Sequence, residues 1–192
     1  MTLDTTQLMA IAAGLGWASG LRIYLVIFLT GLAGFLGWVD LPAGLKLLQH
    51  PLMLGASGLM LCVEFFADKI PGIDSLWDVL HTVVRIPAGA ALAAAVFGTD
   101  HATAAALAGV LGGVLAATSH AAKATTRAAV NTSPEPFSNI GLSLAGDAAV
   151  PGMLWLSWAH PVGALVVLAV LVLAMLLATV WLMKYLRAVI GR

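Results

Sequence analysis

The most constraining feature of this sequence is the stretch 162–183, which contains no charged residue. A helix needs about 20 consecutive apolar residues to cross the hydrocarbon core of a bilayer. The rest of the chain is similar in character, since 61% of all residues are hydrophobic and 9% are charged. A soluble domain is nearer half apolar and a quarter charged. The chain is therefore predicted to be a polytopic integral membrane protein.

The apolar runs predict an all-α transmembrane bundle that forms a single domain over residues 1–192. We expect about six spans, at 7–38, 51–66, 75–98, 102–130, 148–159 and 162–183. The first run is longer than a span needs and rich in glycine, which predicts a tilted, kinked or broken helix. The fifth is short unless it recruits residues from 139 onward. An alternative has four spans, with the third and fifth segments short or re-entrant.

Polar and helix-breaking residues predict the connections and the helix ends. We expect Asp74 or Ser75 to cap the third helix and Pro87 to kink it. The other predicted features are a loop at 39–50, a tight connection at 99–101, a turn at 160–161, and a polar connection at 131–147 containing a short helix capped by Ser138 or Asn139.

The distribution of Lys and Arg predicts the orientation, because cytoplasmic loops carry an excess of both. Six spans with both termini in the cytoplasm place seven of the nine Lys and Arg residues on that side. The seven are Lys69, Arg85, Lys123, Arg127, Lys184, Arg187 and Arg192. We therefore expect an N-in, C-in topology.

Charge and cysteine content argue against several functional classes. The formal net charge is zero, so there is no basic face for nucleic acid. Cys62 is the single cysteine, and the five histidines show no zinc-ligand spacing, so no cofactor is expected and a metal is left open. Gly55-Ala56-Ser57-Gly58 has the GxSG form of some membrane serine proteases, but small residues at this spacing also serve helix packing. An enzyme is therefore not the favoured class.

The third helix carries a stripe of ionisable residues, Asp74, Asp78, His81 and Arg85. Their spacings of four, three and four place them on one helix face. A charge at mid-bilayer costs roughly 2.5–3.5 kcal/mol, so the stripe should face protein, water or the interface. One interpretation is a polar path for an ion or proton, in which His81 titrates near neutrality. The other is a capped helix with ion pairs at the cytoplasmic surface.

The fourth helix ends in a basic stripe formed by His120, Lys123 and Arg127. This pattern predicts an anion-binding lining suited to phosphate or carboxylate. The alternative is a basic helix end that follows the positive-inside rule. Glu64 and Asp68 lie one turn apart at the end of the second span and repel each other, so we expect Lys69, Lys123 or Arg127 nearby.

Arg22 stands alone in the first apolar run, directly after Ser19-Gly20 and Leu21. An intramembrane arginine is a functional-site hypothesis by default. We consider Glu64 a partner for it; snorkelling to the interface is the alternative. Gly109 and Gly113 form a GxxxG pattern on the fourth helix, which we expect to serve as a homo-oligomer interface.

Two motifs resemble a family known as domain of unknown function 4126, a group of bacterial integral membrane proteins. The motifs are Lys69-Ile70-Pro71-Gly72-Ile73-Asp74-Ser75-Leu76-Trp77-Asp78 and Ser138-Asn139-Ile140-Gly141-Leu142-Ser143-Leu144-Ala145-Gly146-Asp147. The resemblance extends from about Gly16 to the last span. It implies a small helical protein of the bacterial inner membrane and carries no activity or catalytic residues to transfer. The second motif ends in Ala-Gly-Asp where a more acidic ending is expected.

The excess of ionisable residues in or beside spans favours a small transporter or channel for an ion or a small anionic solute. The candidate binding residues are Arg22, Glu64, Asp68, Asp74, Asp78, His81, Arg85, His120, Lys123, Arg127, Asn139 and Asp147. One alternative is an enzyme acting on a lipid or polyprenyl phosphate, with Asp74 and Asp78 as acid/base groups or metal ligands. Another is a non-catalytic membrane scaffold.

Overall fold

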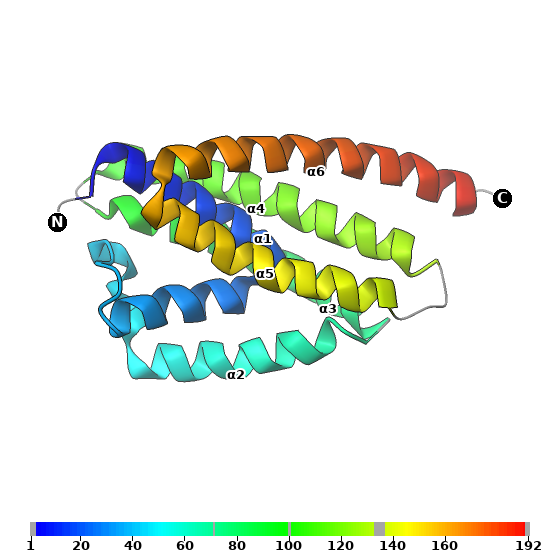
Figure 1. The fold of residues 1–192 in the computed structure, drawn as a ribbon, viewed down its shortest axis with the longest axis horizontal. Coiled ribbons are helices and arrows are strands. Elements are labelled where there is room, and N and C mark those ends of the chain that lie inside the picture. The colour runs from blue at the N-terminus through cyan, green and yellow to red at the C-terminus, as the bar shows by residue number, and fades with distance from the viewer. Residues whose placement is uncertain (1–2, 71, 100, 133–136, 191–192) are drawn as a thin grey trace.

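The computed structural model describes residues 3–70, 72–99, 101–132 and 137–190. In order, the helices are α1 (Thr5–Phe35), the short 3-10 helix η1 (Ala43–Gln49), α2 (Pro51–Ala67), α3 (Ile73–Phe97), α4 (Ala102–Val130), α5 (Phe137–Ala159) and α6 (Pro161–Ile190). They pack lengthwise into one bundle (Figure 1). The predicted all-α bundle is confirmed. The turn residues predicted at 71, 100 and 133–136 lie outside the described residues.

Within the described residues, length and composition identify five helices that suit a membrane span: α1, α3, α4, α5 and α6. The count is six if η1 and α2, which meet at an angle of 69°, form one span. The chain is thus a multi-pass membrane protein. α3 and α5 both run along the bundle (Figure 1), so the alternative that treated them as short or re-entrant is wrong.

α1 is broken at Arg22, whose φ of −149° and ψ of 79° are not helical. After the break the helix folds back toward the end where it began (Figure 1). The two ends of α1 consequently line one cavity, to which Gln7 contributes from one side and Leu29 and Thr30 from the other. The predicted break is confirmed, and the Ser19-Gly20 pair before it is a common cause of sharp kinks.

The folded-back α1 changes the topology. The start of α1 and the end of α6 lie at opposite ends of the bundle (Figure 1), which we call the N-terminal end and the C-terminal end. The N-in, C-in prediction counted the first apolar run as one straight crossing, whereas α1 is broken at Arg22; the orientation relative to a membrane stays a prediction. The α2–α3 turn and the end of α4 lie at the C-terminal end.

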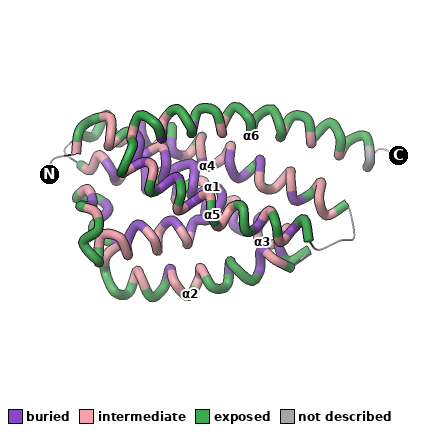
Figure 2. The backbone as a smooth tube through the Cα atoms, viewed as in Figure 1, coloured by how far each residue is buried: buried purple, intermediate pink, exposed green. Residues whose placement is uncertain are grey.

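Three helices approach closely where Gly16, Gly89 and Gly112 meet. A Cβ atom on Gly112 would collide with Ala93 and with the Gly89 carbonyl, and one on Gly16 would collide with the Gly112 backbone. The first half of α1 is buried there, whereas α6 is exposed along most of its length (Figure 2).

The GxxxG pattern of α4 is used inside the chain. Cβ atoms on Gly109 and Gly113 would contact Ala94 and Ala90 of α3. The ridge therefore packs against α3 within the chain, and a homo-oligomer stays a prediction.

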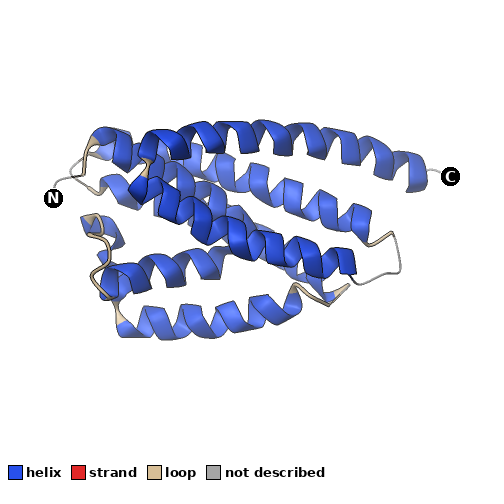
Figure 3. Ribbon diagram, viewed as in Figure 1, coloured by secondary structure: helices blue, strands red, loops and turns tan. Residues whose placement is uncertain are grey.

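Two predicted connections contain helix (Figure 3). The expected loop at 39–50 includes η1. α5 begins at Phe137, so Asn139 lies inside a helix rather than at a cap. Asn139 and Ser143 are each 1% exposed, because they face polar groups inside the bundle. The polar side chains of Asn139 and Ser143 led to the incorrect prediction of a connection over this part of α5.

The predicted cap of α3 also needs correction. The N-cap residue is Gly72, at φ 88°, and Asp74 lies within the first turn. The Asp74 carboxylate nevertheless accepts hydrogen bonds from the backbone N–H groups of Gly72 (2.8 Å) and Ser75 (2.6 Å). It therefore satisfies orphan donors at the helix start, as a capping group does. Pro87 lies inside α3, as expected.

Candidate functional site

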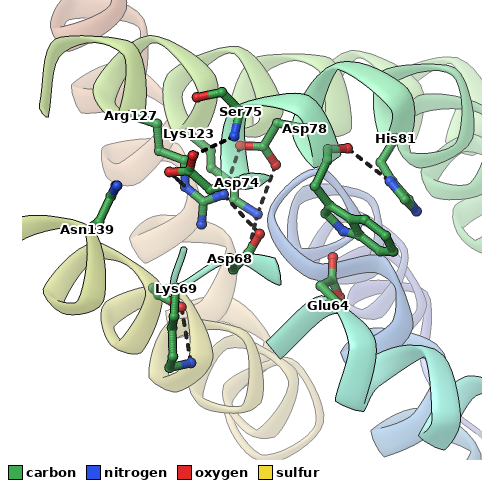
Figure 4. A network of polar contacts seen from close by, with 12 residues as sticks. Glu64, Asp68, Lys69, Asp74, Ser75, Asp78, His81, Lys123, Arg127 and Asn139 are labelled. Carbon is green, nitrogen blue, oxygen red and sulfur yellow. Dashed lines mark hydrogen bonds and ion pairs between the residues drawn. The ribbon is translucent and has the colours of Figure 1, made fainter. Parts of the chain in front are cut away.

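The predicted site residues gather around the break in α1. Ten of the twelve are buried, and Lys123 and Asp147 are partly exposed. Their ion pairs join five cations, Arg22, Lys69, Arg85, Lys123 and Arg127, to five acids, Glu64, Asp68, Asp74, Asp78 and Asp147. We call these ten residues the charge network. Figure 4 labels Glu64, Asp68, Lys69, Asp74, Asp78, Lys123 and Arg127 from it.

Asp68 lies at the centre of the charge network, at the C-cap of α2. Its carboxylate is 2.6 Å from Arg22 Nη1 and 2.9 Å from both Lys123 Nζ and Arg127 Nη1. Burial alone would raise the pKa of Asp68, but the three cations outweigh it and hold that pKa well below its usual value. The expected pairing of the acidic end of α2 with the basic end of α4 is confirmed.

Asp78 forms the second centre of the charge network. Oδ1 is 2.6 Å from Arg85 Nη1 and 3.2 Å from Lys123 Nζ, and Oδ2 is 3.1 Å from Arg127 Nη1. Both carboxylate oxygens are therefore engaged by cations. This weakens the interpretation of Asp78 as an acid/base group or metal ligand.

Arg85 extends the charge network toward the N-terminal end of the bundle. Its Nη2 donates to Glu64 Oε1 at 2.8 Å, and both side chains are fully buried. Its Nη1 lies 3.3 Å from His120 Nδ1. Because a guanidinium only donates, Nδ1 must accept, so the His120 proton is on Nε2, which faces Thr82 Oγ1 at 2.7 Å. The expected pairing of Glu64 with Arg22 is wrong.

Asp147 connects the charge network to the surface. One of its oxygens is 3.0 Å from Arg22 Nη2 and the other is 3.4 Å from Lys69 Nζ. Arg22 Nη2 also donates to Ser143 Oγ at 2.7 Å. Lys69 and Asp147 are 20% and 21% exposed. Partial burial lowers the pKa of Lys69, and the neighbouring Asp147 opposes that shift.

Asp74 belongs to a more polar branch beside Arg127, whose Nε lies 3.9 Å away. Asn131 Nδ2 is 3.4 Å from Asp74 and donates to Ser75 Oγ at 3.0 Å. Asn139 Nδ2 donates to Asn131 Oδ1 at 2.6 Å. This branch ties the start of α5 to the α3–α4 pair.

His81 lies beside the charge network. Its Nδ1 is 2.9 Å from the Trp77 carbonyl, which only accepts, so Nδ1 carries a proton. Its Nε2 faces the Tyr24 hydroxyl at 3.1 Å, and its ring stacks on Trp77. His81 is thus tied to its own helix through Nδ1 and to α1 through Nε2.

The structure decides several alternatives left open by the sequence. The α3 stripe faces the interior rather than a cytoplasmic surface, since Asp74, Asp78, His81 and Arg85 are at most 8% exposed. Among the described residues, no three His, Cys, Asp or Glu side chains converge as a metal site. Ser57 Oγ donates to the Met53 carbonyl at 2.6 Å, as a helix-packing serine does.

Sequence reasoning missed four contributors to the site: Tyr24, Lys69, Thr82 and Ser143. Lys69 was considered only as a partner of the acidic pair. Ser143 bonds Arg22 and lies one turn before Asp147, so the spacing on α5 was an available signal. Nothing in the sequence marks Tyr24 or Thr82, which look like ordinary members of apolar helices.

Two cavities flank the charge network along α1 and α5. The basic cavity, about 370 Å³, lies near the C-terminal end and includes Arg22, Lys123 and Arg127 in its lining. The tryptophan cavity, about 630 Å³, lies near the N-terminal end and is lined by Trp38, Trp155 and Trp158 among others.

A family model described as Domain of unknown function (DUF4126) matches residues 9–181. The chain belongs to this family. Comparisons with curated proteins and with solved structures found no match. The DUF4126 match spans all ten residues of the charge network, so the site lies within the family's shared region.

Proposed function

We propose that this DUF4126 chain is a small membrane transporter or channel that moves an ion or a small anionic solute. One observation carries the proposal: five buried or half-buried acids and five bases converge where α1 is broken. Discontinuous membrane helices of this kind commonly form the substrate and ion sites of transporters.

The energetics of the charge network support a function beyond stability. Removing an ion from water costs several kcal/mol, and replacing a buried ion pair with apolar residues is often neutral or stabilising. Arg85 and Glu64 are fully buried, as are Arg22 and Asp68. A bundle that needed only to hold together would avoid this cost.

The two cavities support a route along the α1–α5 interface. The barrier between them is apolar and tight, with Ile11, Val150 and Met153 at most 4% exposed. Gly14 lies against Ser157 in the same region. This arrangement suits an occluded state with one vestibule at each end.

Arg22 is the proposed gating residue. It faces the basic cavity, terminates the first half of α1 and binds two carboxylates. Asp147 is the more exposed of these carboxylates. An entering anion would replace Asp147 on Arg22, which keeps the buried charge balanced while the solute is bound.

We also propose the orientation and the location. The positive-inside rule places the C-terminal end, which carries Lys69, Arg127, Lys184 and Arg187, in the cytoplasm. The N-terminus then lies outside. The expected location is a bacterial plasma membrane.

The test is current across a solid-supported membrane that carries purified protein in liposomes. Steps of pH, Na⁺, K⁺ and a panel of small anions are compared for wild type, Arg22→Lys and Asp147→Asn. Lys184→Gln is the matched control, because Lys184 is exposed and forms no ion pair among the described residues.

We expect a wild-type current that both network variants reduce at least about tenfold, the equivalent of roughly 1.4 kcal/mol on the barrier. Lys184→Gln should carry the wild-type current. If the folded wild-type protein gives no current in any gradient and takes up no radiolabelled anion, the proposal is rejected. The favoured alternatives would then be a membrane scaffold or an enzyme acting on a lipid phosphate.

A further inference from the structure

The basic cavity has a pronounced polar asymmetry. Its lining includes Arg22, Lys123 and Arg127, and it contains no acid among the described residues. The acids that balance these cations, including Asp68 and Asp78, lie behind them and outside the lining. A molecule in the cavity would therefore meet the cationic side of the charge network.

The walls of the basic cavity on α5 and α6 are mainly apolar and include several small residues. α5 contributes Ala145 and Ala149, and α6 contributes Leu171, Ala174 and Ala178. Small side chains leave room for a ligand beside the polar groups.

The rim shows where the basic cavity opens. Ala145, Ala174 and Ala178 are exposed, so the cavity reaches the bundle surface between α5 and α6. In a membrane protein that surface faces lipid. A ligand can thus enter sideways from the bilayer with its charged group pointing inward.

We propose that the basic cavity binds a membrane amphiphile with one acidic headgroup and a single apolar chain. The headgroup would pair with Arg22 and Lys123, and the chain would lie along α5 and α6. The cavity volume of about 370 Å³ is near the lower limit for ligand sites, roughly 300–1,000 Å³, which suits one chain.

Charge balance identifies the group that the headgroup would displace. Asp147 binds Arg22 Nη2 at 3.0 Å and is 21% exposed, so it can turn toward water. An acidic headgroup would take its place on Arg22. This inference concerns binding and does not depend on transport.

The probe is undecanoate carrying a bromine atom at the end of its chain, added to the purified full chain in nonionic detergent. Bromine quenches nearby tryptophan, and Trp17 lines the basic cavity, with its Nε1 3.3 Å from Met175 Sδ. Fluorescence is recorded during titration. Acetate tests the headgroup alone, and the methyl ester of the probe tests the uncharged chain.

We expect saturable quenching that Trp17→Phe largely removes and that unlabelled undecanoate reverses. Ala174→Leu, which fills the cavity, should weaken binding at least about tenfold, whereas Ala169→Leu, exposed on α6 outside the lining, should not. Asp147→Asn should tighten binding, because it removes the competing carboxylate.

Three results would overturn the inference. They are equal quenching by the methyl ester, competition by acetate at the same concentration as undecanoate, and unchanged quenching in Trp17→Phe. The Ala174→Leu result is interpreted only when its melting temperature matches that of Ala169→Leu. If the two melting temperatures differ, the comparison of wild type with Trp17→Phe decides. Because no gradient is applied, a failure here is separate from a failure of the transport assay.

Discussion

Two halves of this bundle hold the same helices together by different means. In the glycine-packed half, around Gly16, Gly89 and Gly112, the backbones of α1, α3 and α4 nearly touch. In the charged half, around Arg22, Asp68 and Asp78, the same three helices and the end of α2 meet through ion pairs. One mode of packing needs no buried charge, and the other depends on it.

The difference indicates what the charged half is for. Small residues let membrane helices approach closely and gain van der Waals contact. The chain achieves this in one half and could have extended it into the other at lower desolvation cost. The concentration of all ten ionic groups in one half therefore favours a site over a structural clamp.

The largest expected effect is in the glycine-packed half. Gly112→Leu places a side chain against Ala93 and the Gly89 backbone, which cannot move aside. Overpacking typically costs about 1–3 kcal/mol where neighbouring side chains can adjust. Backbone cannot adjust in this way, so we expect a loss above that range and little folded protein. Fluorescence-detected size exclusion of solubilised membranes measures this. Gly55→Leu is the control, since nothing lies within 4 Å of its Cβ position; equal loss in both variants would contradict the packing argument.

A nearly equal effect is expected in the charged half from Asp68→Asn. The change leaves Arg22, Lys123 and Arg127 short of a shared counter-charge. Breaking a buried ion pair from one side costs about 3–5 kcal/mol. The measurement is denaturant unfolding in detergent. The double variant Asp68→Asn/Arg22→Gln should recover part of the loss, and full additivity would show that the two residues do not interact.

The pH dependence of this loss sharpens the comparison. Because the pKa of Asp68 is depressed in the folded protein, its stabilisation is present above the ordinary value of 3.8 and is lost as pH falls below it. The difference in melting temperature between wild type and Asp68→Asn should be constant from about pH 5 to 8 and shrink in more acidic buffer. Gly112→Ala, from the glycine-packed half, should show no such trend relative to wild type.

The smallest effect is expected at the surface end of the charge network. Asp147→Asn leaves Arg22 with Asp68 and removes a partly exposed partner. We expect a loss of about 1 kcal/mol in the free energy of unfolding, since pairs near water are worth little. Lys184→Gln should change stability by less than about 0.5 kcal/mol. A loss at Asp147 as large as at Asp68 would show that the surface end is structural.

The sequence predicted which ionisable residues come together but not how they pair. Helical spacing alone placed Asp74, Asp78, His81 and Arg85 on one face, and His120, Lys123 and Arg127 on another, as found. The choice of Asp68 and Asp147, rather than Glu64, as partners of Arg22 depended on the depth at which each helix crosses its neighbours. No spacing within one helix contains that information.

By itself the sequence determined that the chain resides in a membrane, that it is helical, and that its ionisable residues must be sheltered. These follow from composition and periodicity, because lipid cannot solvate charge or an unpaired backbone. Only the tertiary structure decided that α1 turns back at Arg22, so that the start of α1 and the end of α6 lie at opposite ends of the bundle. An apolar run of the same composition fits a lipid span or a hairpin buried among other helices. The choice depends on the neighbours that cover it.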